Sequence, residues 1–561
     1  MVTSVFNIAV AGLSTAQAGL SAISNNISNA STKGYSRQDI IQTAAPGVFS
    51  TVGYFGNGSE VQDVRRSSSE FLNQRLNEAL ASESYYQTYS NQIAQIDGVL
   101  SDDENGVSAG FTGFFTALQD LTVRPGDSAS RESVMTAART VAARLNGVDS
   151  TLNRIRDSIN DALQGSVDAV NANTAQLADL NMQITDAINR ANGATPNELL
   201  DKRDMLLQDL SKYVQTTVVN NADGTFDVYL SNGQPLVNKT KSTQLDATRD
   251  PFNPQNISVG LRLASGADEK LVIYDAKALG MGQIAGLMQM RDTDLNRYQA
   301  TLGVVAGQFA SKINDIQSNG YDLSGGFGQP FFAIEPSLVS RATTNQSSAT
   351  ASISSLDYAK ATGKDFEVIN DAGTIKYRTA NTRDNFVEAT VISNGDPGKY
   401  SIGYELEFTL TGPLSNGDKF LLAPTRAAAS TIRVVLEGPS GIAASTVAGA
   451  KGDASNLQKM AKLQTDPVVF NAFGSEQQVT ITAAFNQLIS KVGNRTREIQ
   501  NDLTTRTAVR ESAEAQQQDM SGVNLDEEAA KLLQYQQAYQ ASGRVVAMSK
   551  DLFDQLIAAI S

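Results

Sequence analysis

The sequence contains no histidine, no cysteine and no tryptophan among its 561 residues. Without histidine or cysteine, a chain cannot form a Ser-His-Asp triad, a cysteine nucleophile, a thiolate zinc site or the usual haem ligand set. Catalysis would have to use carboxylates, lysine, tyrosine or a metal held by oxygen atoms alone. Most common enzyme classes are therefore excluded, and we expect no catalytic residues, no metal site and no cofactor.

The lack of cysteine also excludes disulfide bonds, which suits a cytosolic protein or one that stays unfolded during export. Acidic residues outnumber basic ones by 59 to 45, which leaves a net charge of −14. Because nucleic acids and anionic membranes are bound by clustered positive charge, we expect neither as a partner.

Long apolar runs are scarce as well. No unbroken run approaches the roughly 18 apolar residues of a membrane-spanning helix, so none is expected. The first basic residue is Lys33, so the positively charged start of a signal peptide is missing. If the protein leaves the cell, we expect it to use another export route.

Both ends of the chain carry hydrophobic residues at a spacing of seven. The N-terminal set is Phe6, Leu13, Leu20 and Ile27, with Ala9, Ala16, Ile23 and Ala30 three positions further on. The C-terminal set is Leu525, Leu532, Tyr539, Val546, Phe553 and Ile560. Sustained heptads of this kind predict helices that pack against another helix along a seam. We expect the two bulky sets to form an assembly seam.

The opposite face of the N-terminal helix is unusual because it carries Ser, Asn, Gln, Thr and Gly but no charge before Lys33. A helix exposed to water normally carries charged residues on its polar face. One interpretation is a helical hairpin formed by the two ends of a single chain. The other, which the missing charge favours, is that the paired ends also pack against other copies.

A helix stop follows the first heptads. Residues 25–37 combine side chains that tolerate left-handed backbone or bond exposed backbone groups. The residues that carry this motif are Asn25, Asn26, Asn29, Thr32, Gly34 and Tyr35. The stretch resembles the N-terminal signature of the flagellar rod, hook and hook-associated protein family, with Ser28 where alanine is commoner. Residues 521–539 resemble the matching C-terminal signature of that family.

Between the ends, patterns alternate in a nested order. Helices are predicted at 67–100, with a capping box from Ser67 to Glu70, and at 131–192. Another helix opens at Thr195 as N-cap with Pro196 after it. Strands are predicted at 213–275, where Asp223-Gly224 marks a hairpin, and helix returns at 281–318. Alternating strands with turns at Asn394-Gly395 and Asn416-Gly417 fill 340–452, and helix resumes near 455.

This order predicts an α+β multi-domain fold, with a long helical coiled-coil core formed by both chain ends and a β-rich inserted outer domain. We expect a terminal domain of residues 1–32 and 525–561. A mainly helical body would comprise 33–339 and 453–524, with a small β subdomain at 213–275. Residues 340–452 would form the inserted outer domain.

Asp201, Arg203 and Asp204 lie on the helix that begins near Pro196. They could be catalytic carboxylates with an arginine clamp, but ion pairing on a helix face is the favoured interpretation. The surrounding stretch is similar to the branch of the flagellar family whose members join the hook to the filament.

The resemblance implies a structural subunit that forms a tubular ring at that junction. Its partners would be copies of itself, the hook protein and a second junction protein on either side. It also implies flagellar type III export, a cytosolic chaperone on the C-terminal helix, and an extracellular place in the flagellum. A hook or distal rod protein, a carboxylate-based glycan hydrolase and an adhesin are the alternatives.

Overall fold

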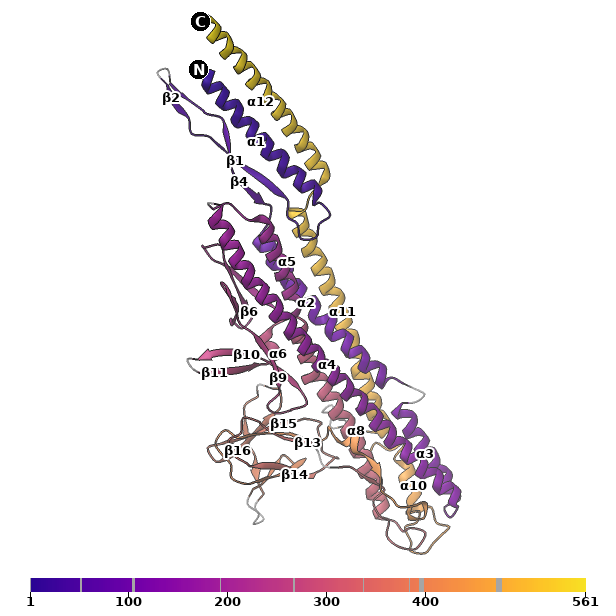
Figure 1. The fold of residues 1–561 in the computed structure, drawn as a ribbon. Helices are drawn as coiled ribbons and strands as arrows, with labels where there is room; N and C mark the ends of the chain where they lie inside the picture. Colours follow the sequence, from indigo (N-terminus) through magenta and orange to yellow (C-terminus); the bar gives the residue numbers. More distant parts are fainter. Residues whose placement is uncertain are drawn as a thin grey trace.

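The protein is elongated, with both chain ends together at one tip (Figure 1). The computed structural model describes residues 2–50, 53–102, 106–191, 193–265, 268–335, 338–382, 384–392, 398–470 and 477–560. A bundle of long helices forms the rod of the molecule, and a β-rich lobe stands beside it (Figure 1). The predicted α+β fold with long terminal helices is confirmed.

Helices account for the length of the molecule. Their bounds are α1 Val2–Ser28, α2 Glu70–Leu100, α3 Val107–Val123, α4 Ser128–Arg190, α5 Asn197–Tyr213, α6 Ala276–Leu279, α7 Gln283–Gln289, α8 Asn296–Ser318, α9 Ala428–Thr431, α10 Ser455–Lys462, α11 Ile481–Ser521 and α12 Leu525–Ile560. A π-helix, Met290–Leu295, joins α7 to α8, and a 3₁₀ turn covers Pro439–Gly441. At about 1.5 Å per residue, the 63 residues of α4 span about 95 Å.

The rod is held together by one continuous core. Along α4 the buried positions follow each other at three or four residues, as in Leu152, Ile155 and Ile159, so one stripe faces its neighbours throughout. At the far end of the rod, aromatic rings from three segments pack together, most of them edge to face. These rings belong to Phe111, Phe114, Phe115, Phe309, Phe331 and Phe332. The helices predicted at 131–192 and 281–318 are confirmed, the second with a π-helical segment inside it.

Two small antiparallel sheets lie against the rod. The first has the order β5-β6-β7-β8, with bounds Thr216–Asn220, Phe226–Leu230, Pro235–Asn238 and Lys241–Ser242. The predicted hairpin at Asp223-Gly224 is confirmed, because Val218 pairs with Val228 across it. The second sheet has the order β11-β10-β9, from Asp268–Tyr274, Ile257–Ser265 and Leu245–Arg249.

The lobe contains two further antiparallel sheets around a core of its own. One has the order β13-β21-β15-β16-β17, from Leu338–Arg341, Lys419–Ala423, Phe366–Asp371, Thr374–Thr379 and Val387–Glu388. The other has the order β14-β20-β19-β18, from Thr350–Leu356, Leu406–Thr411, Lys399–Ile402 and Thr390–Val391. Inward side chains such as Phe366, Phe408 and Phe420 fill the space between them. The turn at Asn416-Gly417 is confirmed, whereas Asn394-Gly395 lies outside the described residues.

After the lobe the chain returns to the rod. β22, Arg433–Val434, pairs with β12, Phe332–Ala333, and Ala429, Ile432 and Ile442 join the rod core. A short ladder of β23, Val469–Phe470, and β24, Gln478–Val479, precedes α11. The lobe approaches α8 at two glycines, because a Cβ on Gly303 or Gly307 would overlap the backbone at Thr425 or the ring of Tyr358. The lobe therefore rests directly on the backbone of α8.

A long antiparallel hairpin near the chain ends was not predicted. β1, Gln38–Ala44, pairs with β4, Ser59–Arg66, and β2, Val48–Ser50, pairs with β3, Gly53–Phe55, at its tip. The stretch looked like a linker because Gly, Thr and Gln interrupt its apolar residues. The hairpin runs beside α1 (Figure 1).

Two predicted helix starts are wrong in detail. The N-cap of α2 is Ser69, whose hydroxyl accepts the N–H of Leu72, whereas the Ser67 hydroxyl donates to the carbonyl of Met520. The N-cap of α5 is Pro196, and the hydroxyl of Thr195 donates to Asp63 instead. In both places a long-range partner competes successfully with the local capping bond.

Candidate functional site

The first and last helices pack side by side in opposite directions (Figure 1). Their contact repeats every seven residues: Gly12 faces Ser542, Gly19 faces Tyr535, and Asn26 bonds to Glu528. Ala9, Ala16 and Ile23 are buried on the same side of α1. The two chain ends thus form an antiparallel pair with a heptad register.

Small residues let the helices approach closely. A Cβ added to Gly19 would lie 2.6 Å from the Tyr535 ring, and one added to Gly12 would lie 2.9 Å from the Ser542 hydroxyl. Ser549, one further heptad along α12, is also buried. On the α1 side the intrachain seam therefore consists mainly of glycine and alanine, which make room for the Tyr535 ring and let the two helices lie close together.

The bulky heptad residues lie beside this seam. Phe6, Ile27, Leu525, Tyr539 and Phe553 are exposed, and Leu13, Leu20, Leu532 and Val546 are half-buried. The side chain of Ile560 lies outside the described residues. Within one copy, these large apolar side chains therefore remain mostly without a complete partner surface among the described residues. Their role as an assembly seam remains a prediction.

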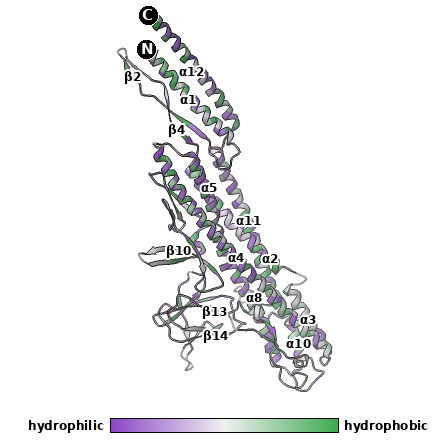
Figure 2. Ribbon diagram, in the orientation of Figure 1, coloured by the Kyte–Doolittle hydropathy of each residue, from purple (hydrophilic) through white to green (hydrophobic). Residues whose placement is uncertain are grey.

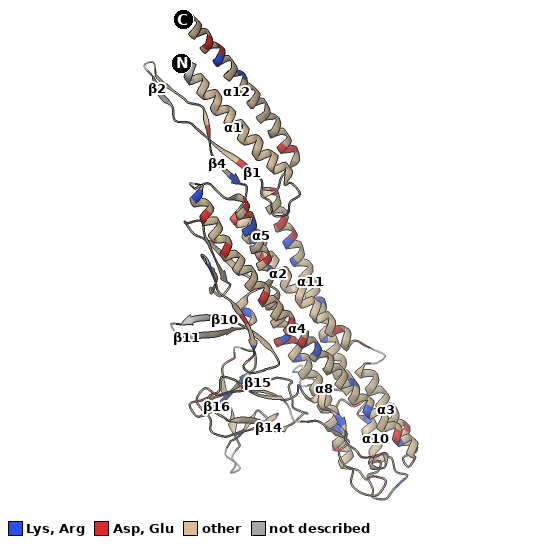
Figure 3. Ribbon diagram, in the orientation of Figure 1, with Lys and Arg blue, Asp and Glu red and all other residues tan. Residues whose placement is uncertain are grey.

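The pair of helices differs from the rod in charge and hydropathy. α1 carries no charged residue along its length (Figure 3), and apolar residues recur along it (Figure 2). Val5–Ser28 is long and apolar enough to cross a membrane by length and composition alone, although it holds no unbroken apolar run of that length. Its polar residues are small, so they interrupt the apolar runs but hardly lower the mean hydropathy of the helix. In the structure this helix pairs with α12.

A buried polar network ties α1 to α12 at their lower end. Asn26 and Glu528 are both fully buried, and the Asn26 amide donates to the Glu528 carboxylate at 2.8 Å. The Asn26 oxygen accepts from the Gln38 N–H at 2.9 Å and from the Tyr35 hydroxyl at 2.8 Å. Burial, followed by the charges of Asp201 and Glu528, raises the pKa of Tyr35 to about 12, which keeps its hydroxyl a donor.

The other residues of the N-terminal motif shape the turn that follows α1. The Asn29 amide donates to both the carbonyl and the side-chain oxygen of Asn25, and Thr32 donates to Asn29 at 3.2 Å. Gly34 has a φ of +81°, and a Cβ there would lie 2.2 Å from the sulfur of Met205 on α5. The turn therefore docks on the rod only with glycine at this position.

Charged residues complete the joint between the terminal pair and the rod. Arg66, at the end of β4, bonds to Asp201 at 3.0 Å and Asp204 at 2.7 Å on α5. Burial opposes the Arg66 charge, but the two carboxylates outweigh burial and raise its pKa. Asp201 also accepts the Ser36 N–H, and Arg203 bonds to Asp204 at 3.0 Å. The favoured ion-pair interpretation is confirmed, although the main partner comes from β4.

The break between α11 and α12 lies at the same joint. The Arg37 N–H donates to the carbonyl of Ser521 at 2.8 Å, and Ser67 binds Met520. Two surface ion pairs, Arg37 with Glu527 and Lys531 with Asp39, then link the start of α12 to β1. Sequence reasoning missed these contacts because each joins segments more than 450 residues apart.

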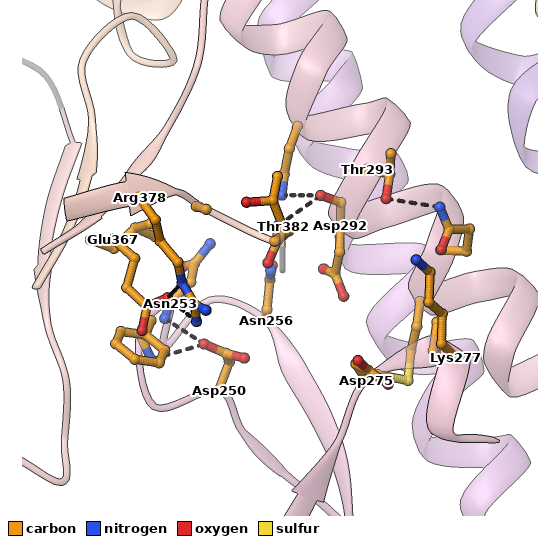
Figure 4. Close-up of a pocket in the computed structure, with 18 of the residues that line it drawn as sticks. Asp250, Asn253, Asn256, Asp275, Lys277, Asp292, Thr293, Glu367, Arg378 and Thr382 are labelled. Carbon is orange, nitrogen blue, oxygen red and sulfur yellow. Dashed lines mark hydrogen bonds and ion pairs between the residues drawn. The ribbon is translucent and has the colours of Figure 1, made fainter. Parts of the chain in front are cut away.

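A cavity with a volume of about 640 Å³ lies elsewhere, between the rod and the lobe (Figure 4). Its carboxylates are engaged within the protein: Glu367 bonds to Arg378, and Asp292 bonds to Arg291. Asp250 accepts backbone N–H groups, and Asp275 caps α6. The arrangement gives the rod and lobe a polar joint and presents no free carboxylate pair of the kind used in glycoside hydrolysis.

Three family models match parts of the chain. Residues 93–332 match the flagellar hook-associated protein FlgK helical domain. Residues 516–559 match the flagellar basal body rod FlgEFG protein C-terminal family, and residues 6–35 match the flagella basal body rod protein family. The two terminal matches cover α12 and α1 with the turn after it.

Several curated proteins are similar over nearly their whole length. Flagellar hook-associated protein 1 of Salmonella typhimurium is 32% identical over 99% of both chains. The protein of that name from Escherichia coli is 30% identical over 99% of both chains. The one from Bacillus subtilis is 25% identical over 97% of this chain and 96% of the other.

A solved structure of the flagellar hook junction protein FlgK from Burkholderia pseudomallei has the same fold. It aligns with a TM-score of 0.72 at 22% identity, over 80% of this chain and all of that one.

Proposed function

Because this chain belongs to the family of flagellar hook-associated protein 1, whose members are structural proteins of the flagellar hook junction, we propose that it assembles there into a tubular ring through α1 and α12. It is a flagellar component, and the alternatives of hook protein, distal rod protein, hydrolase and adhesin are not favoured. We further propose that it has no enzymatic activity.

The observation that carries the proposal is that small residues make the contact between α1 and α12, whereas many of the large apolar residues of these helices remain exposed. Glycine, alanine and serine make most of the contact within one chain, with the Tyr535 ring packed over Gly19, while Phe6, Tyr539 and Phe553 stay exposed beside it. Exposed large apolar side chains in a row are typical of protein interfaces, since water does not stabilise them. Sister copies packed around the pair would cover them.

The placement of these exposed residues on α1 and α12 sets the proposed position of each domain in the ring. Residues 1–32 and 525–561 would form the inner wall of the ring, with the β1–β4 hairpin beside them. The body, 33–339 and 453–524 with its β subdomain at 213–275, would set the thickness of the wall. The lobe, 340–452, would face outward.

Export and partners belong to the same proposal. An uncharged α1 and a partly exposed α12 would gain much of their order from packing, since long helices depend on it. Such ends suit type III export in an unfolded state, with a cytosolic chaperone covering α12 beforehand. After export, the ring would contact the hook protein on one side and a second junction protein on the other.

The test is complementation of bacteria that lack their own junction protein. The full chain should restore filaments, and a chain without residues 525–561 should stay soluble but restore none. A sharper variant is Tyr539→Glu with Phe553→Glu, which charges two exposed seam positions. The matched control is Phe71→Glu with Met182→Glu, at exposed apolar positions on the rod.

We expect the seam variant to keep the helix content of the parent and to lose filaments, while the control keeps both. Normal filaments from the seam variant or from the truncated chain would refute assembly through the terminal helices.

A further inference from the structure

The tip of the β1–β4 hairpin presents aromatic side chains to solvent. Phe49 is 85% exposed, Tyr54 60% and Phe55 47%. The rings of Phe49 and Tyr54 pack edge to face with centroids 4.9 Å apart, and the Tyr54 hydroxyl accepts the Gly47 N–H at 2.9 Å. The tip is therefore a preformed aromatic surface. We call these three side chains the aromatic tip.

The surroundings of the aromatic tip are free of charge. No residue between Asp39 and Glu60 is charged, and the hairpin around β2 shows none in Figure 3. Exposed hairpin ends are normally polar, and exposed strands usually carry charges that discourage association. An uncharged aromatic end is instead typical of a surface that another protein covers.

The hairpin lies on the α1 side of the terminal pair. A Cβ on Gly58 would lie 3.3 Å from Ala11, and Thr15 bonds to Ser59 at 3.3 Å, so the strands run along α1 towards its start. The aromatic tip lies beyond these contacts, near the N-terminal end of the chain (Figure 1).

A second apolar surface lies at the same height on α12. In the heptad register of the pair, the first turns of α1 stand opposite residues near 549 of α12. Met548 and Leu552 are exposed there by 58% and 49%, and because they are four residues apart they lie on the same side of the helix. We call these two side chains the apolar flank of α12, because the exposed charged residues Lys550, Asp551 and Asp554 lie elsewhere around the helix.

We propose that the aromatic tip of one copy docks on the apolar flank of α12 in the neighbouring copy of the ring. The two surfaces are different, both are apolar, and they lie level with each other on one molecule, which is what a head-to-tail contact that closes a ring requires. The inference rests on the proposed ring and names one contact within it.

The small area of the aromatic tip determines under which conditions the contact forms. An aromatic side chain buries about 150–250 Å² at most, so three of them supply less than the roughly 800 Å² per partner of a stable interface. The contact alone would not hold two free copies together. It would form only where the terminal helices of many copies are packed at the same time, and the free chain would stay monomeric.

Cross-linking tests the contact directly because the chain has no cysteine of its own. The variant Phe49→Cys with Leu552→Cys is expressed in bacteria lacking their junction protein, and isolated flagella are treated with a short bismaleimide. We expect a ladder of cross-linked multimers from flagella and none from the soluble chain. The control, Phe71→Cys with Leu552→Cys, should give no ladder.

If the double-cysteine chain does not assemble into flagella, a second variant tests the contact. Phe49→Ser with Tyr54→Ser should keep the helix content of the parent and reduce the number of filaments per cell at least tenfold. Filaments at the parental number, or assembled flagella whose cysteine pair gives no multimers, would overturn the docking and leave the proposed function intact. Failure of the unsubstituted chain to restore filaments would instead overturn the proposed function.

Discussion

At the scale of single residues, Asn26 connects the two chain ends. Its amide group makes four bonds: to the Glu528 carboxylate, to the carbonyl and N–H of Gln38, and to the Tyr35 hydroxyl. Each partner lies in a different segment, and Asn26 and Glu528 have no exposed surface. A buried carboxylate that loses its donor is strongly destabilised, so the identity of residue 26 matters more than its helix propensity.

We expect Asn26→Leu to destabilise the packing of α12 by about 3 kcal/mol, because it leaves the buried Glu528 carboxylate without its amide donor. Amide hydrogens of α12 should then exchange roughly a hundredfold faster, since 1.4 kcal/mol corresponds to a factor of ten. The control Asn25→Ala removes a partner of Asn29 within the turn and should change exchange less than tenfold. Equal exchange in both variants would show that the network does not anchor α12.

A second residue makes stability depend on pH. Burial raises the pKa of Asp149 on α4 to about 6, while Asn153, Arg156 and Gln299 oppose the shift. The folded state therefore binds the proton more tightly than the unfolded state, whose value is 3.8. Its contribution favours folding below about pH 4 and is lost as pH rises to 6. Because the chain has no histidine, few other groups titrate in this range.

We expect Asp149→Asn to raise the free energy of unfolding at pH 7 by up to about 3 kcal/mol, because the buried position then carries no charge. The gain should disappear near pH 4, where the parent is already protonated. Urea unfolding at pH 4 and pH 7 measures both values. A gain of the same size at both pH values would rule out the ionised carboxylate as the cause.

Sequence alone identified the residues of the N-terminal motif but could not supply their partners. Asn25, Asn29 and Thr32 act locally, as turn residues are expected to do. Asn26 and Gly34 act on Glu528 and Met205, which only the fold brings near. Local capping rules therefore explained half of the motif, and tertiary contacts explain the rest.

At the scale of elements, α1 and α12 form their register through small residues. Hydrophobic periodicity gives most weight to bulky side chains, so it indicated Leu13 and Leu20 as the inner positions of the helix pair. The observed contact lies one residue earlier, at Gly12 and Gly19, because close packing of backbones needs side chains of minimal size. The bulky residues are displaced to the flanks, where they remain available to other copies.

We expect Gly19→Ala to destabilise the terminal pair by about 1–2 kcal/mol, although alanine favours helix by about 1 kcal/mol, because the added Cβ meets the Tyr535 ring. Gly165→Ala on α4 is the matched control. Nothing lies within 4 Å of a Cβ there, so this change should stabilise the rod by up to about 1 kcal/mol. Thermal unfolding followed by circular dichroism measures both, and stabilisation by both changes would contradict the close packing.

Other helices and strands were predicted correctly where their sequence patterns are long or unambiguous. α4 and the hairpin at Asp223-Gly224 have long or unambiguous signals and were found. The β1–β4 hairpin was missed because its strands pair across a tip interrupted by Pro46, Gly47 and Gly53. The starts of α2 and α5 were missed by one to three residues because distant partners bind the expected caps.

At the scale of the whole molecule, the nested order of the chain places both ends at one tip and the lobe beside the rod (Figure 1). The nested order predicts that both ends lie together, since each outgoing helical segment has a returning one, but it also predicts the lobe at the opposite end of the molecule, where α3 and α10 lie instead (Figure 1). The joint around Asn26, Arg66 and Asp201 then fixes the terminal pair on the rod. The large exposed apolar residues of α1 and α12 form the part of the surface that a single copy does not cover.

The central claim is that α1 and α12 complete their packing only among sister copies. Hydrogen exchange of both helices, measured in the soluble chain and in isolated flagella that contain it, tests the claim most directly. We predict that α1 and α12 exchange far faster than α4 in the soluble chain and become as protected as α4 in flagella. Equal, strong protection of α1 and α12 in both states would contradict it.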